Sequence, residues 1–140
     1  MPTRRAKQSV PARNRSPFGW WIASYIERFQ WRSSGPIGPS SKCLAYENTI
    51  LIRADSRDRA YQKAMAFGAQ GSDRRWRKYG EPPGQLGRWV FEGVTSLLPI
   101  YERLSDGAEV EWLEHRNTTV GAVKKRVKDK RTLAVFRDGE

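Results

Sequence analysis

The sequence predicts an α+β domain: a mainly antiparallel sheet of about four strands in the order β-β-α-β-β, one packed amphipathic helix and a basic C-terminal helix. Three observations carry this prediction. Aromatic and β-branched residues gather in segments that favour a half-buried pleated surface. One Ala-rich stretch repeats its apolar residues at steps of three and four, as an amphipathic helix does. Segments rich in Gly, Pro and Ser separate these stretches and predict loops.

The first two strands are predicted on either side of a loop. Residues 18–31, FGWWIASYIERFQW, are crowded with aromatic and β-branched side chains and favour a strand. Residues 33–42, SSGPIGPSSK, consist of turn formers and predict an exposed loop. In residues 44–54 most apolar side chains alternate with polar ones, which predicts a second strand, antiparallel to the first.

A helix is predicted directly after the second strand. Asp55 or Ser56 can accept a backbone N–H of its first turn, and the helix dipole favours the anion at Asp58. Gly68 or Gly71 can end it. Its apolar stripe consists of Ala60, Tyr61, Ala64, Met65, Phe67 and Gly68. The small residues of this stripe predict a close approach to the sheet.

The rest of the sheet is predicted from the C-terminal half. Residues 71–87 hold four Gly and two Pro in a polar context and predict a long loop. Residues 88–95 alternate apolar side chains and predict a third strand. Because Pro99 interrupts the continuation, residues 96–104 are predicted as a loop or a short helical turn. An Asp-Gly turn then leads into a predicted fourth strand at residues 109–115.

A last helix is predicted near the C-terminus, capped by Thr118 or Thr119. Val120, Val123 and Val127 mark one side of this helix, and cations fill the rest. The chain therefore divides into a disordered basic arm (1–17), an α+β domain (18–116) and a basic C-terminal helix and tail (117–140). Most tryptophans fall on the predicted strands and are expected in the core: Trp20, Trp21, Trp31, Trp89 and Trp112.

The positive charge is concentrated at the two ends of the chain. The net charge is +11, yet residues 17–120 carry 14 Lys or Arg against 12 Asp or Glu. Basic ends on a nearly neutral domain act as electrostatic tethers for phosphate backbones, or are simply solvated. The cations that we single out in the arm and the last helix are Arg4, Arg5, Arg13, Arg15, Lys124, Lys125, Arg126 and Lys128.

A second basic segment lies inside the domain, in the predicted loop. It interleaves four cations with two aromatic rings: Arg74, Arg75, Trp76, Arg77, Lys78 and Tyr79. Cations neutralise phosphates while aromatic rings stack on bases, which is how proteins hold single strands without sequence preference. The same residue types anchor protein interfaces, and a solvated loop with Trp76 packed beneath it is the third interpretation.

The sequence offers little support for catalysis, a cofactor or a metal. One cysteine, Cys43, excludes an internal disulfide and has no Cys or His at ligand spacing. His115 has no nucleophile or acid placed beside it by a known motif. An enzymatic function would need Glu47, Glu92 and Glu109 to meet. No apolar run approaches the roughly 20 residues of a membrane span, so a cytoplasmic protein is expected.

Five segments in a fixed order resemble the bacterial domain of unknown function 4288 family. They are Trp20-Trp21-Ile22-Ala23, Glu47 with the run Ile50 to Ser56, Ala60-Tyr61-Gln62-Lys63-Ala64, Trp89-Val90-Phe91-Glu92-Gly93-Val94 and Asp106-Gly107-Ala108-Glu109-Val110. The resemblance covers residues 18–114 and leaves out both basic ends. It implies a compact sheet-plus-helix fold and brings no activity with it.

These observations favour a binding protein over an enzyme. The leading hypothesis is a small basic accessory protein that contacts nucleic acid or a ribonucleoprotein through its basic ends and the 74–79 segment. The alternative is a protein-interaction module, such as an immunity-type inhibitor or a subunit of a larger assembly.

Overall fold

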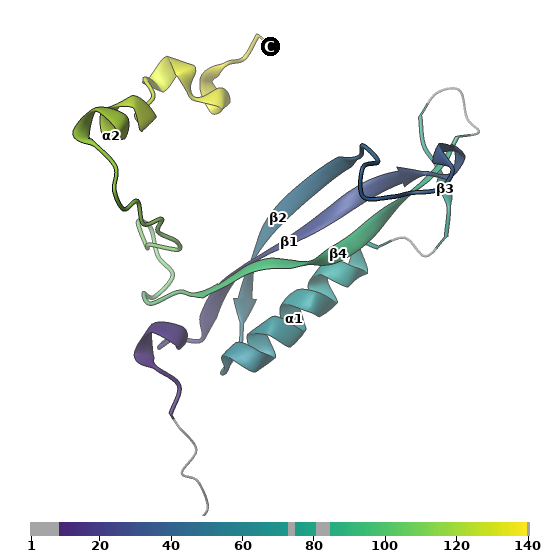
Figure 1. Cartoon of the computed structure of the whole chain (residues 1–140). Helices are drawn as coiled ribbons and strands as arrows, with labels where there is room; N and C mark the ends of the chain where they lie inside the picture. Colours follow the sequence, from purple (N-terminus) through teal and green to yellow (C-terminus); the bar gives the residue numbers. More distant parts are fainter. Residues whose placement is uncertain (1–8, 73–74, 81–84, 140) are drawn as a thin grey trace, which may run out of the picture.

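One helix lies against an antiparallel sheet of three long strands and one short strand (Figure 1). The structure is a computed structural model that describes residues 9–72, 75–80 and 85–139. Its strands and helices are β1 (Trp20–Trp31), β2 (Leu44–Arg53), α1 (Arg57–Gln70), β3 (Arg77–Lys78), β4 (Leu86–Pro99) and α2 (Val120–Arg126). Short 3₁₀ turns lie at Ala12–Asn14, Arg32–Ser34, Lys130–Thr132 and Ala134–Phe136. The strand order is β2-β1-β4-β3, so the predicted α+β class and the β-β-α-β-β order with a C-terminal helix are confirmed.

The core lies between α1 and the face of the sheet that α1 covers. Its buried residues come from β1, β2 and α1: Trp21, Ala23, Ile52, Ala60 and Ala64. Ile50, Ala54, Val94 and Leu97 pack around them. The indole nitrogen of Trp21 donates a hydrogen bond of 3.0 Å to the carbonyl oxygen of Ala54, so the largest core ring keeps its polar atom paired.

The helix α1 begins and ends as the sequence predicts. The Ser56 side chain accepts a hydrogen bond of 3.1 Å from the backbone N–H of Arg59, and Gly71 follows the last residue. Ala60, Ala64 and Gly68 recur every fourth residue and are buried. A Cβ atom on Gly68 would lie 2.4 Å from the Phe91 ring, so only small residues permit this approach. The larger members of the predicted stripe remain outside the contact, since Tyr61 is 50% exposed and Phe67 is 42% exposed.

Ala64→Leu should therefore lower the free energy of unfolding by about 1–3 kcal/mol, because a larger side chain overpacks this contact. Urea unfolding followed by circular dichroism measures the loss. Ala66→Leu, at an exposed position of the same helix, is the matched control and should change stability by less than about 0.5 kcal/mol. Equal losses of stability in both variants would mean that α1 does not contact the sheet through its small residues.

The strand β4 is longer than predicted. Residues 96–99 belong to it, so the loop or helical turn predicted over residues 96–104 is wrong for these four residues. Pro99 ends the strand instead of preventing it, because a final residue needs no further ladder donor. Leu97 pairs with Ala23 and packs against the core, so contacts made far along the chain decide the conformation here. Beyond Pro99, the Ile100 backbone N–H donates to the Trp20 carbonyl oxygen at 2.9 Å.

The strand predicted at residues 109–115 is wrong. This segment has no strand, and Val110, Trp112 and Leu113 are 41%, 57% and 69% exposed. The sheet takes its fourth strand from β3 instead, inside the predicted 71–87 loop. Alternation alone cannot form a strand without a neighbouring edge to pair with. Trp112 is consequently outside the core that the sequence predicted for it.

The C-terminal helix α2 starts where the sequence predicts. The Thr119 side chain accepts a hydrogen bond of 3.1 Å from the backbone N–H of Ala122. The helix ends at Arg126, so Val127 lies just beyond it. Val120 is 73% exposed and Val127 is 77% exposed. This end of the chain therefore presents its apolar and basic side chains to solvent.

Candidate functional site

The sheet extends beyond the C-terminal end of α1, and this uncovered end carries the candidate site (Figure 1). Alternate residues of β1 share one face, so Phe29 and Trp31 follow Trp21 and Ala23 on the face that α1 covers. The pairing of β1 with β4 shifts register twice, and Glu92 and Thr95 are the extra residues of β4. Such bulges increase the twist of the sheet and change the direction in which the side chains beyond them point.

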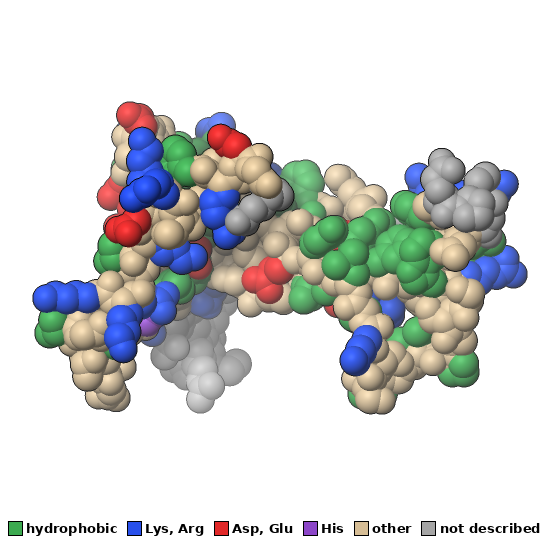
Figure 2. All heavy atoms as spheres, turned by 90° about the horizontal axis from the view of Figure 1, so that it is seen from above, with side chains coloured by type: hydrophobic (Ala, Val, Ile, Leu, Met, Phe, Trp, Pro, Cys, Tyr) green, Lys and Arg blue, Asp and Glu red, His purple; other side chains and the backbone are tan. Residues whose placement is uncertain are grey.

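Five aromatic rings meet at this end of the sheet, and we call them the aromatic cluster: Phe29, Trp31, Tyr46, Tyr79 and Trp89. The Phe29 ring is the centre, with ring-centroid distances of 4.7 Å to Trp31, 5.0 Å to Tyr79 and 5.2 Å to Trp89, all edge to face. The Tyr46 ring stacks on Trp89 at 5.1 Å and an interplanar angle of 24°. Figure 2 shows hydrophobic side chains gathered over the same half of the molecule, away from the C-terminal segment.

The backbone at Gly87 provides the space in which Phe29 sits. Gly87 pairs with Trp31 on one side and with Arg77 of β3 on the other. A Cβ atom at this position would lie 2.3 Å from the Phe29 ring. Because three other rings surround Phe29, it has little freedom to move away. The glycine therefore connects the short strand β3 to the centre of the aromatic cluster.

Gly87→Ala should destabilise the protein by about 1–3 kcal/mol through overpacking and should change the aromatic circular dichroism signal. Gly38→Ala is the matched control because nothing lies within 4 Å of an added Cβ atom there. Thermal unfolding and near-ultraviolet circular dichroism measure the two effects. An unchanged aromatic signal in Gly87→Ala would show that the cluster tolerates displacement of Phe29.

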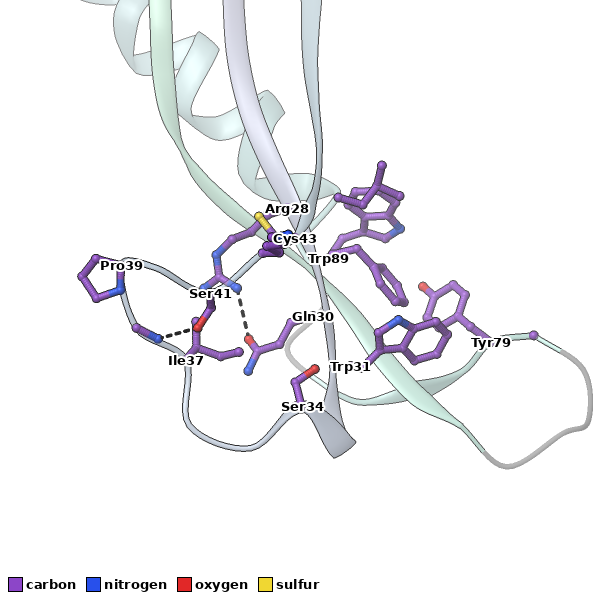
Figure 3. A pocket seen from close by; sticks show the side chains of 15 residues that line it. Arg28, Gln30, Trp31, Ser34, Ile37, Pro39, Ser41, Cys43, Tyr79 and Trp89 are labelled. Atoms are coloured by element: carbon purple, nitrogen blue, oxygen red, sulfur yellow. Dashed lines mark hydrogen bonds between the residues drawn. The ribbon is translucent and has the colours of Figure 1, made fainter.

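A pocket of about 880 Å³ adjoins the aromatic cluster, and Figure 3 shows its lining side chains. Its walls come from the end of β1, the loop between β1 and β2, and Tyr79, Gly80 and Trp89. Trp31, Tyr79 and Trp89 gather on one side of β1, whereas Ile37, Pro39 and Ser41 lie on the other (Figure 3). Among the described residues, the lining includes Arg28 and Lys42 and no carboxylate. Since Arg28 donates to Glu92 at 2.8 Å, Lys42 is the cation of this wall without an acidic partner in the described chain.

The structure joins part of the predicted 74–79 segment to this pocket. Arg77 and Lys78 form β3 and are exposed, and the Tyr79 N–H donates to the Gln85 carbonyl oxygen at 3.0 Å. The half-buried Trp76 ring lies under the guanidinium of Arg88, 4.4 Å from the ring centroid. Arg75 is exposed, and Arg74 lies outside the described residues. Tyr79 is thus the member of this segment that reaches the aromatic cluster.

The basic ends of the chain are not brought to this pocket. Arg13 lies in the first 3₁₀ turn and Arg15 directly follows it; both are exposed, and the Tyr101 hydroxyl donates to the Arg13 carbonyl oxygen. Figure 1 places α2 and β3 at opposite ends of the sheet. The predicted cations of the C-terminal segment, Lys124, Lys125, Arg126 and Lys128, are all exposed. Arg4 and Arg5 lie outside the described residues.

The structure places the acidic and nucleophilic candidates on different segments of the described chain. Glu92 pairs with Arg28, and no group of three or more His, Cys, Asp or Glu residues could hold a metal ion there. Glu109 lies after β4, in the segment that forms no strand. Cys43 is an exposed free thiol in the wall of the pocket, and His115 is exposed in the C-terminal segment. Among the described helices, none is long and apolar enough to cross a membrane.

Sequence reasoning found Tyr79 but did not identify Phe29, Tyr46 and Trp89 as one site. The available signal was alternation, because Phe29 and Trp31 occupy alternate positions of a predicted strand. Alternation shows that two rings share a face, but only the strand register shows which rings from β2 and β4 join them. The register pairs Phe29 with Leu44 and with Trp89.

Comparison with known proteins supports one assignment. Neither the curated proteins nor the solved structures contain a match to this chain. A family model described as "Domain of unknown function (DUF4288)" matches residues 20–112. The match begins at the first residue of β1, includes the whole sheet and α1, and ends before α2. The protein therefore belongs to the DUF4288 family.

Proposed function

We propose that this protein is a non-enzymatic binding protein that contacts nucleic acid, or a ribonucleoprotein, at the pocket beside the aromatic cluster. The observation that carries the proposal is the lining of that pocket, whose described residues combine aromatic rings with the cations Arg28 and Lys42. A ligand that presents both flat rings and negative charge suits this combination.

Exposed cations in and next to the lining segments support an anionic ligand. Arg75, Arg77 and Lys78 are exposed and shortly precede the lining residue Tyr79 in the chain, and Lys42 is an exposed lining residue of the loop between β1 and β2. Arg75, Lys78 and Lys42 form no ion pair within the described residues, so their charge is available to phosphates. The basic ends of the chain add long-range attraction, which speeds encounter without reading sequence.

The salt dependence of binding tests this proposal. Fluorescence anisotropy with a labelled single-stranded oligonucleotide of about 10 nucleotides gives the dissociation constant at several salt concentrations. Deleting residues 1–16 should flatten the log-log slope by about 0.7–0.9 for each phosphate that the arm neutralises in the intact protein. The matched control is an arm of equal length in which every Arg and Lys becomes Gln. Binding that ignores salt in the whole chain would overturn the proposal.

A protein partner is the second candidate, favoured by the apolar side chains that the C-terminal segment exposes. Val120, Val127 and Val135 are 73%, 77% and 79% exposed in a segment that makes little contact with the sheet. On this alternative the protein is an immunity-type inhibitor or a subunit of an assembly. This alternative predicts a complex with a protein that resists salt. The complex should be lost in Trp76→Ala and should persist when the basic ends are deleted. A pull-down with and without nuclease separates the two candidates.

A further inference from the structure

The aromatic cluster lies at the end of the sheet that α1 leaves uncovered, and its rings differ in how far they are held by their neighbours. Phe29 is held by its neighbours and by Gly87, so it serves as the support. Trp31, Tyr79 and Trp89 surround that support and are only half-buried. Tyr46 stacks one ring face on Trp89 and is still 51% exposed. The cluster therefore presents ring surface to solvent at the mouth of a pocket.

We propose that this cluster is a stacking subsite for an unpaired base of a single-stranded nucleic acid, with Tyr79 and Trp31 as the rings that the base contacts. The inference rests on the proposed function and specifies its ligand. Both rings line the pocket and lie close to one another on the same side of β1 (Figure 3). Every base has a π face, so such a subsite accepts bases of any sequence.

The composition of the pocket favours a nucleic acid strand as the occupant. Besides the rings, the described lining residues include Lys42, Ser34 and Ser41. The hydroxyl and ammonium groups of these residues are able to bind the sugar-phosphate of a strand whose base stacks on the rings. The charged side chains among the described lining residues, Arg28 and Lys42, are both cations and attract a polyanionic strand.

The same geometry discriminates against a duplex. Bases inside a duplex have both faces covered by their neighbours, and exposing one costs unstacking energy. An unpaired base enters a pocket of about 880 Å³ without that cost. We therefore expect the protein to bind a single strand more tightly than a duplex of the same length, at equal salt concentration.

An abasic oligonucleotide separates stacking from charge attraction. It has the same number of phosphates as oligothymidylate but no bases, and both are measured by fluorescence anisotropy with the full chain. The expected result is about tenfold tighter binding of oligothymidylate, within the range that one stacked base supplies. Equal affinity for the two probes, with the predicted salt dependence intact, would overturn the stacking inference and leave the proposed function standing. Failure to bind either probe would overturn both.

A pair of substitutions at Tyr79 locates the subsite. Tyr79→Phe keeps the ring and should keep the preference for oligothymidylate, whereas Tyr79→Leu removes the π face and should abolish the preference while leaving abasic binding unchanged. Trp31→Leu should act in the same way, and it provides the test if Tyr79→Leu does not fold. A preference that survives in a folded Leu variant would overturn the assignment of that ring. The control, Lys78→Ala, should lower the affinity for both probes by the same factor.

Discussion

Trp21→Ala is expected to lower the free energy of unfolding by about 3–5 kcal/mol, the largest stability loss that we predict. Trp21 belongs to β1, is 3% exposed and is part of the core between α1 and the sheet. Its removal leaves a cavity and also leaves the Ala54 carbonyl oxygen without the indole donor. Urea unfolding measured by circular dichroism gives the loss directly.

Trp112→Ala is the control for that prediction. Trp112 is 57% exposed and touches Tyr101 at a ring-centroid distance of 5.5 Å. Its removal should cost less than about 1 kcal/mol, since an exposed ring buries little apolar area. If the two variants lost the same stability, the core would not lie between α1 and the sheet as described.

Reversing the charge of Arg75, Arg77 and Lys78 to Glu is expected to weaken binding of a single-stranded oligonucleotide by a factor on the order of 100 at low salt. The change replaces three positive charges with three carboxylates next to the lining residue Tyr79, and carboxylates repel phosphates. The measurement is the dissociation constant of a probe of about 10 nucleotides, within the site size of known single-strand binding folds.

The matched control reverses Lys124, Lys125 and Arg126, which gives the same change in net charge at the other end of the sheet. This variant should weaken the short probe much less, because α2 lies far from the pocket in Figure 1. If the two variants weakened oligonucleotide binding equally, the net charge of the whole protein would account for binding, and the pocket would not be the binding site.

Local chemistry predicted the elements that depend on neighbours in the sequence. Ser56 caps α1 and Gly71 follows it because hydrogen bonds of a helix end are made within a few residues. The Ala60, Ala64 and Gly68 ridge was visible as a repeat of small residues, and it predicts a close approach whatever lies opposite. The first two strands and their antiparallel pairing were likewise predicted, since they are consecutive and joined by a loop of turn formers.

The sequence by itself determined the class of the fold, the position of α1 and the concentration of charge at the chain ends. The tertiary structure decided which segments form the second half of the sheet and which aromatic rings meet. Residues 109–115 alternate as a strand does but find no edge, whereas Arg77 and Lys78 pair with β4 from within a predicted loop. Strand pairing requires a partner that is distant in sequence, and its register cannot be derived from either strand alone. The pocket depends on that register, because Phe29, Tyr79 and Trp89 come from three different strands or their ends.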